Sequence, residues 1–348
     1  TQGVSSAASD VYKRQRAAGL CHSDLSVIDG SRPRPLPMAL GHEAAGEVVE
    51  LGPGVESLQV GDRVVLAFVP SCGECGPCNA GRAALCEPGA AANAAGTLLS
   101  GERRWRSDDG EVIQHHLGVS AFSEFTVVSE RSAVRIPDDL DFTTAAVFGC
   151  AALTGVGAAL NAANVASGES VAVFGLGGVG LSALLGAKLA GCCNLIAVDP
   201  VASKRELALE LGADAAFDGA PDTSDAIRAT TRGGVDKAIE TAGSAKVLRA
   251  AWDATRRGGT TVTVGLPDPS QELSIPAVTL TAEERTLKGS YLGSASPAVM
   301  LPRLFELWAE GRLPLERLVS HTLDLDSINE GFDRLHDGTA VRQIVTFA

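Results

Sequence analysis

The sequence contains few aromatic side chains and no long run of basic residues. Phe, Trp and Tyr make up 4% of its 348 residues, whereas glycine alone contributes 39, a composition that predicts close backbone packing and many tight turns. Lys and Arg number 29 against 42 Asp and Glu, so the formal net charge is −13. Because phosphate contacts need clustered Lys and Arg, this balance argues against nucleic acid or an anionic membrane as the main partner.

A confident membrane-spanning run is also missing. The apolar stretch 171–187 is interrupted by five glycines and ends at Lys188, so it is too short and too glycine-rich for a membrane span. With 45% hydrophobic and 20% charged residues, the chain is expected to bury a core, and its length suits two domains. No signal peptide is visible, although a truncated start would hide one, and we expect a reducing, cytoplasmic compartment.

The start of the chain joins poorly to the rest. Residues 10–15 read like the translation of a transposon-end sequencing adapter, and we interpret residues 1–15 as a sequencing artefact, the alternative being an ordinary polar leader. The natural sequence would then become readable at Arg16, in the middle of a strand. Strands expected before Arg16 would be absent, which predicts an uncovered edge on the first sheet.

The rest of the chain shows two different patterns. Over 46–65 and 122–136, short β-branched runs separated by Gly and Pro predict the antiparallel strands of a small barrel-like domain. From Ala151 onward, strands and helices alternate, which predicts a parallel, doubly wound sheet. After about Gly289 the chain becomes helical around 302–310 and ends in a strand-like run.

A glycine-rich turn follows the predicted strand 171–174. Bare backbone at this position can approach a pyrophosphate at the N-terminus of the next helix. Asp199 ends the following strand, 19 residues beyond Gly180, where a dinucleotide site has an acidic residue. Its carboxylate would accept hydrogen bonds from the ribose and repel a 2′-phosphate. This favours NAD over NADP, although Lys204 and Arg205 lie nearby and a solvated carboxylate is the alternative. The turn consists of Gly175, Leu176, Gly177, Gly178, Val179 and Gly180.

Four of the eight cysteines fall within fifteen residues, in a loop rich in Gly, Pro and Asn. Four thiolates complete the tetrahedral shell of zinc and leave no position for substrate, so a structural zinc site is predicted. An iron–sulfur cluster is the alternative, because it is also held by thiolates. The four residues, called here the four-cysteine loop, are Cys72, Cys75, Cys78 and Cys86.

A second candidate metal site consists of residues far apart in the sequence. Cys21, His42 and Cys150 would provide two sulfur ligands and one nitrogen ligand, with one coordination position open. That is the arrangement of a catalytic zinc in alcohol oxidation. From spacing alone, a single Cys or His is more often structural than a metal ligand.

From Arg16 to Ala348, the chain resembles the zinc-dependent medium-chain alcohol dehydrogenases, in the long form that carries a structural-zinc loop. The resemblance implies a Rossmann doubly wound parallel sheet that binds NAD (151–291). It also implies a GroES-like, mostly antiparallel β-barrel catalytic domain (16–150 and 292–348), two zinc ions per chain, and a homodimer or homotetramer. The motifs that carry it are Cys21-His22-Ser23-Asp24, Gly41-His42-Glu43, Gly149 to Gly155, the four-cysteine loop, the glycine turn with Asp199, and the closing strand after Arg342.

The resemblance also implies roles for single residues. Cys21, His42 and Cys150 would hold the catalytic zinc. The Ser23 hydroxyl would take the proton from the alcohol oxygen, Asp24 would orient His42, and Glu43 would lie behind the zinc and modulate it.

Further positions resemble cofactor and substrate contacts of the family. His22 and Arg342 would hold the cofactor pyrophosphate. Phe68 and Phe122 resemble pocket-lining residues, which suits an apolar or aromatic alcohol, with plain core packing as the alternative. The remaining cofactor-binding positions are Thr154, Lys204 and Val264.

Two departures from the family pattern affect the predicted chemistry. Ser26 stands where the proton relay often ends at a histidine, which leaves water or His22 for proton exit. Arg32 and Ala90 stand where the branch that oxidises hydroxymethylglutathione has an acid and an arginine, which argues against that activity. We therefore predict an NAD- and zinc-dependent dehydrogenase of primary alcohols and aldehydes. The alternatives are a polyol or thiol-adduct dehydrogenase of the same fold, or an inactive truncated fragment that binds zinc and dinucleotide.

Overall fold

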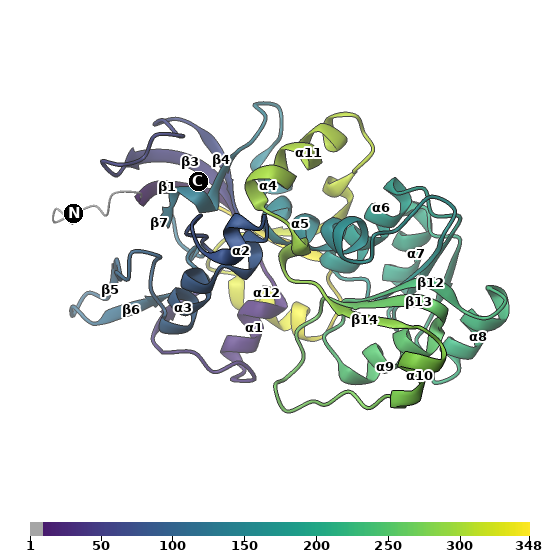
Figure 1. Ribbon diagram of the computed structural model, residues 1–348. Coiled ribbons are helices and arrows are strands. Elements are labelled where there is room, and N and C mark those ends of the chain that lie inside the picture. The colour runs from purple at the N-terminus through teal and green to yellow at the C-terminus, as the bar shows by residue number, and fades with distance from the viewer. Residues whose placement is uncertain (1–9) are drawn as a thin grey trace. The chain divides into compact units, whose positions relative to one another are not determined.

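The computed structural model describes residues 10–348 and divides into two compact units (Figure 1). Unit 1 runs up to Cys150 and resumes from Ala295 to Ala348, and unit 2 is Ala151–Ser294. The chain is thus divided after Cys150 and after Ser294, and the assignment of the two units as catalytic and NAD-binding domains stays a prediction.

Unit 1 is built on a seven-stranded sheet in the order β15-β16-β1-β3-β4-β8, with β7 also paired to β1. All pairs are antiparallel except β15 with β16. A three-stranded sheet, β2-β6-β5, accompanies it. The strands are β1 (Asp10–Gly19), β2 (Met38–Ala39), β3 (Glu43–Leu51), β4 (Arg63–Leu66), β5 (Trp105–Arg106), β6 (Val112–His115), β7 (Phe125–Ser129), β8 (Ala133–Arg135), β15 (Val319–Leu323) and β16 (Arg342–Thr346).

The first strand corrects one expectation. Strand β1 begins at Asp10, and its first half pairs with β3 on one side and β7 on the other. Within the described residues, the expectation of an uncovered sheet edge before Arg16 is therefore wrong. Residues 1–9 of the predicted artefact lie outside the described part of the chain, and the origin of 10–15 stays a prediction.

Helices accompany the sheets of unit 1. Helix α1 begins directly after Cys21, at the end of β1. Leu20, Leu323 and Val345 form a buried apolar cluster with Phe332 and Leu335 of α12, which anchors the start of α1. The helices are α1 (His22–Ile28), α2 (Gly76–Asn79), α3 (Glu87–Ala95), α4 (Phe142–Val147), α11 (Pro297–Ala309) and α12 (Ile328–His336).

Unit 2 is a six-stranded parallel sheet in the order β11-β10-β9-β12-β13-β14, as the strand–helix alternation predicts. Figure 1 shows α6 and α7 on one face and α8 and α9 on the other. The strands are β9 (Ser170–Phe174), β10 (Asn194–Val198), β11 (Ala215–Phe217), β12 (Val235–Glu240), β13 (Thr255–Thr263) and β14 (Thr286–Gly289). The helices are α5 (Leu153–Gly157), α6 (Gly178–Leu189), α7 (Ala202–Leu211), α8 (Thr223–Thr230), α9 (Ala245–Ala254) and α10 (Ala277–Ala282).

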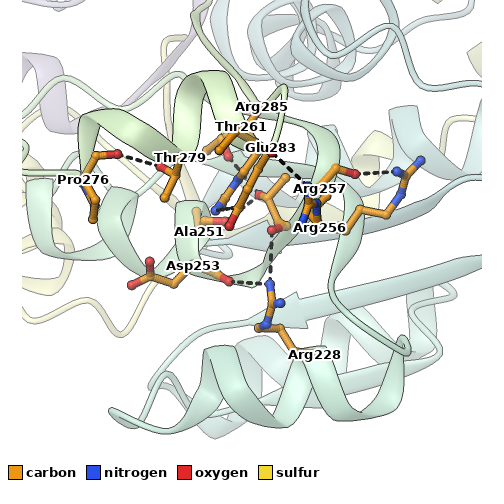
Figure 2. Close-up of polar contacts among 12 residues, drawn as sticks. Arg228, Ala251, Asp253, Arg256, Arg257, Thr261, Pro276, Thr279, Glu283 and Arg285 are labelled. Carbon is orange, nitrogen blue, oxygen red and sulfur yellow. Dashed lines mark hydrogen bonds and ion pairs between the residues drawn. The ribbon is translucent and has the colours of Figure 1, made fainter.

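Arginines cluster at the amino ends of β13 and β14 (Figure 2). The Arg285 guanidinium stacks 3.9 Å from the centroid of the Trp252 ring. Arg228 donates to the backbone oxygens of Asp253 and Thr255, and Arg257 donates to that of Ala282. Parallel strands keep their amino and carboxyl ends at opposite edges of the sheet. These arginines therefore join the chain segments that enter β13 and β14, at the edge of the sheet opposite the glycine turn.

One segment is long and apolar enough to cross a membrane by length and composition alone. It is Phe142–Ala162. Of its most apolar window, 89% is buried inside the structure. Burial of this kind is typical of a core helix, so the segment is weak evidence for a membrane span.

Candidate active site

Unit 1 brings together the three predicted ligands of the catalytic metal. The donor atoms of Cys21, His42 and Cys150, together with a carboxylate oxygen of Glu43, all lie within 4.8 Å of one another. Strands β1 and β3 are neighbours, and Gly19 pairs with Glu43. This register places Cys21, two residues after the end of β1, beside the start of β3. We call Cys21, His42 and Cys150 the thiol–imidazole site.

Glycines make the close approach at this site possible. A Cβ on Gly19 would lie 2.8 Å from Glu43 Oε2, and one on Gly149 would overlap the carbonyl oxygen of Leu66 at the end of β4. The bare backbone at Gly149 therefore lets the chain that carries Cys150 pack directly against the sheet.

The donor set fits a zinc ion. Two cysteine sulfurs and one imidazole nitrogen leave one tetrahedral position open. His42 Nε2 is buried and has no hydrogen-bond partner among the described residues. A hydrogen bond from Cys150 is the largest cause that lowers the pKa of Cys21 well below its usual value, while the same contact raises the pKa of Cys150. One thiolate is thus favoured even before a metal binds.

Asp24 determines which nitrogen of His42 is available. His42 Nδ1 lies 3.1 Å from Asp24 Oδ2, and both side chains are buried. Burial would raise the pKa of Asp24, but the imidazoles of His42 and His116 outweigh it and lower the pKa to about 2. An ionised carboxylate only accepts hydrogen bonds, so Asp24 holds the proton of His42 on Nδ1. Burial would lower the pKa of His42, but Asp24 and Cys21 outweigh it and raise that pKa well above its usual value, so a metal at Nε2 would displace a proton.

Glu43 and Arg342 form a buried ion pair beside the site. Arg342 Nη1 lies 2.9 Å from Glu43 Oε1 and donates to the Leu20 carbonyl oxygen at the same distance. Burial raises the pKa of Glu43 to about 8, more than Arg342 lowers it. Glu43 Oε1 also lies 3.8 Å from His42 Nε2. Arg342 thus contacts a carboxylate of unit 1, and its role at a pyrophosphate stays a prediction.

The other predicted residues of unit 1 are divided between the site and the core. Phe68 lies edge-on to His42, with ring centroids 5.3 Å apart. Phe122 instead stacks edge-on with Phe332, 5.9 Å away, in the α12 cluster, which is the packing role that the sequence leaves open.

Helix α1 carries the residues predicted to handle the proton. Ser23 is half-buried on α1, and His22 is exposed. The Ser26 hydroxyl donates to the His22 carbonyl oxygen at 2.8 Å. That hydroxyl is therefore engaged within the helix backbone.

The four-cysteine loop forms a second donor cluster. Its four sulfurs lie within 4.8 Å of one another. Backbone N–H groups of Glu74 and Cys75 donate to the Cys72 sulfur, and that of Gly89 donates to Cys86. The two bonds to Cys72 lower its pKa to about 7. Burial instead raises the pKa of Cys78 to about 12 and also raises that of Cys86. The loop therefore favours one thiolate, at Cys72, and a closed four-sulfur zinc site would have to displace the protons of the others.

Unit 2 forms the glycine turn at the predicted place. Gly175 has φ of +91°, and a Cβ on Gly180 would overlap the Gly175 carbonyl oxygen. Asp199 accepts the backbone N–H of Leu176 at 2.8 Å and that of Val201 at 2.9 Å. Asp199 therefore holds the turn itself, in addition to its predicted role at the ribose.

The remaining predicted cofactor residues surround this sheet edge or lie on α5. Burial lowers the pKa of Lys204 on α7. The Val264 N–H donates to Glu240 O, just after β13. The buried Thr154 hydroxyl on α5 has no hydrogen-bond partner among the described residues.

Comparison with known proteins identifies the family. Residues 7–138 match the alcohol dehydrogenase GroES-like domain, and residues 178–308 match the zinc-binding dehydrogenase family. The sequence is 38% identical to the NDMA-dependent alcohol dehydrogenase of Amycolatopsis methanolica, over 97% of this chain and 91% of that protein. The chain belongs to the zinc-dependent medium-chain alcohol dehydrogenases. The predicted family and the predicted fold class are confirmed.

Relatives within this alcohol dehydrogenase family differ in substrate. An S-(hydroxymethyl)glutathione dehydrogenase of Synechocystis is 36% identical over 94% of this chain and 90% of that protein. The crystal structure of benzyl alcohol dehydrogenase from Acinetobacter calcoaceticus superposes with a TM-score of 0.90 at 34% identity, and the match covers 98% of this chain and 92% of that one. The family thus establishes an alcohol-dehydrogenase-type oxidoreductase and leaves the substrate open.

Sequence reasoning missed three polar residues that support this dehydrogenase's sites. Thr241 Oγ1 donates to the Gly175 carbonyl oxygen at 2.8 Å, and buried Glu240 accepts the Gly243 N–H at 2.6 Å. Their position at the carboxyl end of a predicted parallel strand could have identified both. His116 lies 3.0 Å from Asp24, and no local pattern in the sequence indicates that contact.

Proposed function

We propose that the protein is an NAD- and zinc-dependent dehydrogenase that interconverts primary alcohols and aldehydes, with apolar or aromatic alcohols as the preferred class. The observation that carries this proposal is the convergence of Cys21, His42 and Cys150, with Asp24 on the far nitrogen of the imidazole. Phe68 beside His42 supports an apolar substrate. A second zinc in the four-cysteine loop, a homodimer or homotetramer, and a reducing cytoplasmic location belong to the same proposal.

The residues of the site have separate tasks in this mechanism. Zinc, when bound by the thiol–imidazole site, would act as a Lewis acid that lowers the pKa of the alcohol oxygen. Asp24 holds His42 in the tautomer that presents Nε2. Ser23 would take the alcohol proton. NAD, when bound at the glycine turn with Asp199 at its ribose, would supply the acceptor for the hydride. The Ser26 hydroxyl is occupied by the helix backbone, so exposed His22 or water carries the proton onward.

A substrate panel tests the proposal. Purified protein loaded with zinc is incubated with NAD and aliphatic primary, aromatic primary and polyol substrates, and with S-hydroxymethylglutathione, while NADH absorbance is followed. A parallel series contains NDMA. We expect NADH from the primary alcohols. If only the polyol or the glutathione adduct is oxidised, the proposed substrate class is wrong. If no substrate of the panel is oxidised, the result favours a protein that binds zinc and dinucleotide without catalysis.

The choice of NAD over NADP is tested at Asp199. In Asp199→Asn, one side-chain oxygen can still accept a backbone N–H, but the charge that repels a 2′-phosphate is gone. Hydrogen bonds to charged groups contribute about 1.5–3 kcal/mol, so the ratio of kcat/KM for NAD to that for NADP is expected to fall at least about tenfold. Asp214→Asn is the matched control, because Asp214 accepts the Leu195 N–H elsewhere in unit 2. An unchanged ratio would leave Asp199 with a purely structural role.

A further inference from the structure

A second imidazole contacts the carboxylate that orients His42. His116 Nδ1 lies 3.0 Å from Asp24 Oδ1, while His42 Nδ1 lies 3.1 Å from Oδ2 of the same group. The two rings are nearly perpendicular, with centroids 5.6 Å apart. His116 is only 3% exposed. This buried ring has no role in the proposed proton and hydride transfer.

The loop after β6 holds His116 in a fixed place. The His116 N–H donates to Ser120 Oγ at 3.0 Å, and the Ser120 N–H returns to the His116 carbonyl oxygen at 3.2 Å. Leu117 and Ser120 both have φ of +52°, a conformation that costs roughly 1 kcal/mol or more per residue outside glycine. The loop that carries His116 is therefore strained in its backbone.

The same loop is joined to the segment that carries His42. The N–H groups of Ala121 and Phe122 donate to the carbonyl oxygens of Gly41 and Leu40, each at 3.0 Å. A Cβ on Gly41, where φ is +93°, would lie 2.7 Å from the Phe122 nitrogen. His116 and His42 are thus carried by two segments that are fixed to each other, and they approach Asp24 from two sides.

Three nitrogens from these two segments lie against the carboxylate. Oδ1 accepts the Gly41 N–H at 2.9 Å and faces His116, and Oδ2 faces His42. Without His116, Oδ1 would keep a single donor, and the carboxylate could turn away from His42. A fully buried carboxylate with too few donors is also unfavourable.

We propose that His116 is a positioning residue of the thiol–imidazole site: it fixes the plane of Asp24 and, through Asp24, the orientation and tautomer of the zinc ligand His42. The proposal rests on the proposed zinc function. Partners behind a metal ligand typically change metal affinity or activity by about 10- to 100-fold when they are removed.

An alternative use of the same atoms is a further metal site made of Asp24, His42 and His116, whose donor atoms lie within 4.8 Å of one another. The nitrogen–oxygen separations of 3.0 and 3.1 Å lie within hydrogen-bond range, and neither His116 Nδ1 nor His42 Nδ1 has another hydrogen-bond partner among the described residues. The lone pair on Nδ1 of His42 would have to bind that metal in place of a proton. Hydrogen bonding is therefore the reading that we test.

Two amide variants separate positioning from packing. The Asn nitrogen in His116→Asn takes roughly the place of Nδ1 and can still donate to Asp24, whereas the longer Gln in His116→Gln moves the donor beyond it. Zinc affinity is measured by competition with a chromophoric chelator. The zinc ion held by the thiol–imidazole site is identified as the one that Cys150→Ser no longer binds. We expect wild-type affinity within about threefold for His116→Asn and a 10- to 100-fold loss for His116→Gln. His321→Asn, at an exposed position of β15, is the control.

Several results would overturn this inference. Equal zinc affinity in wild type and His116→Gln would do so, as would equal loss in both amide variants, since packing alone then explains the effect. A third metal equivalent that disappears with His116 would establish the alternative site. Visible spectra of the cobalt-loaded variants provide a second readout, in which only His116→Gln should shift the bands. Failure of the proposed function would look different, because wild type itself would then bind no zinc at Cys150 or oxidise no alcohol.

Discussion

Replacing Cys150 with serine is expected to abolish alcohol oxidation and to remove one of the two zinc equivalents. A serine hydroxyl is neutral at pH 7 and a poor zinc ligand, so the remaining Cys21 and His42 would hold the ion weakly. A metal that acts as a Lewis acid contributes several kcal/mol to catalysis. At about 1.4 kcal/mol per tenfold change in rate, kcat/KM should fall at least roughly 10³-fold. Metal content and NADH formation are the measurements.

Two further cysteine variants make that result specific. Cys192→Ser changes a half-buried thiol in the loop before β10 and should leave both zinc equivalents and the activity intact. Cys86→Ser changes the buried ligand of the four-cysteine loop and should remove the other equivalent while lowering thermal stability. Full activity of Cys150→Ser with both metals retained would contradict the proposed site.

The regular features of this fold could be predicted because they are local. The alternation of strands and helices after Ala151 predicts the parallel sheet, and the glycine turn follows the predicted strand β9. Strands β11 and β14, with three and four residues, are too short for a periodic signal and were not predicted. Their place in the sheet depends on neighbours that only the folded chain supplies.

The site was predictable in its ligands and much less in the groups around them. Asp24 lies close to Cys21 in the chain, so its contact with His42 could be proposed from the motif. His116 and Arg342 reach the site from a distant loop and from the last strand. No spacing in the sequence indicates either contact, because each depends on how β1, β3, β6 and β16 pack together in the folded chain.

Strand β1 buries two polar side chains with few partners, and this observation leads to a prediction on stability. Lys13 is fully buried and has one acceptor, the Val64 carbonyl oxygen at 3.3 Å. Gln15 is also fully buried, and neither atom of its amide has a hydrogen-bond partner among the described residues. A buried polar group without a partner costs about 1–3 kcal/mol. Both residues lie within the match to the GroES-like domain, and the foreign origin predicted for residues 1–15 stays a prediction.

The double variant Lys13→Met and Gln15→Leu is therefore expected to stabilise unit 1 by about 3 kcal/mol or more. Both changes keep the side-chain volume nearly constant. For a unit of this size, each kcal/mol corresponds to roughly 2–4 °C, so thermal scans should show the midpoint rise by about 6 °C or more. Arg16→Met, on the more exposed face of β1, is the matched control and should change little.

The dependence of this gain on pH identifies its cause. Burial holds the pKa of Lys13 well below its usual value in the folded state. The unfolded chain then binds one more proton than the folded chain at pH values between the lowered pKa and about 10.4, so wild-type stability should rise with pH across that window. Lys13→Met removes the titrating group and should flatten the rise between pH 7 and 9.5. If the stability of wild type and variant rose equally steeply with pH, Lys13 would be solvated in the folded state. Its burial would then not destabilise β1.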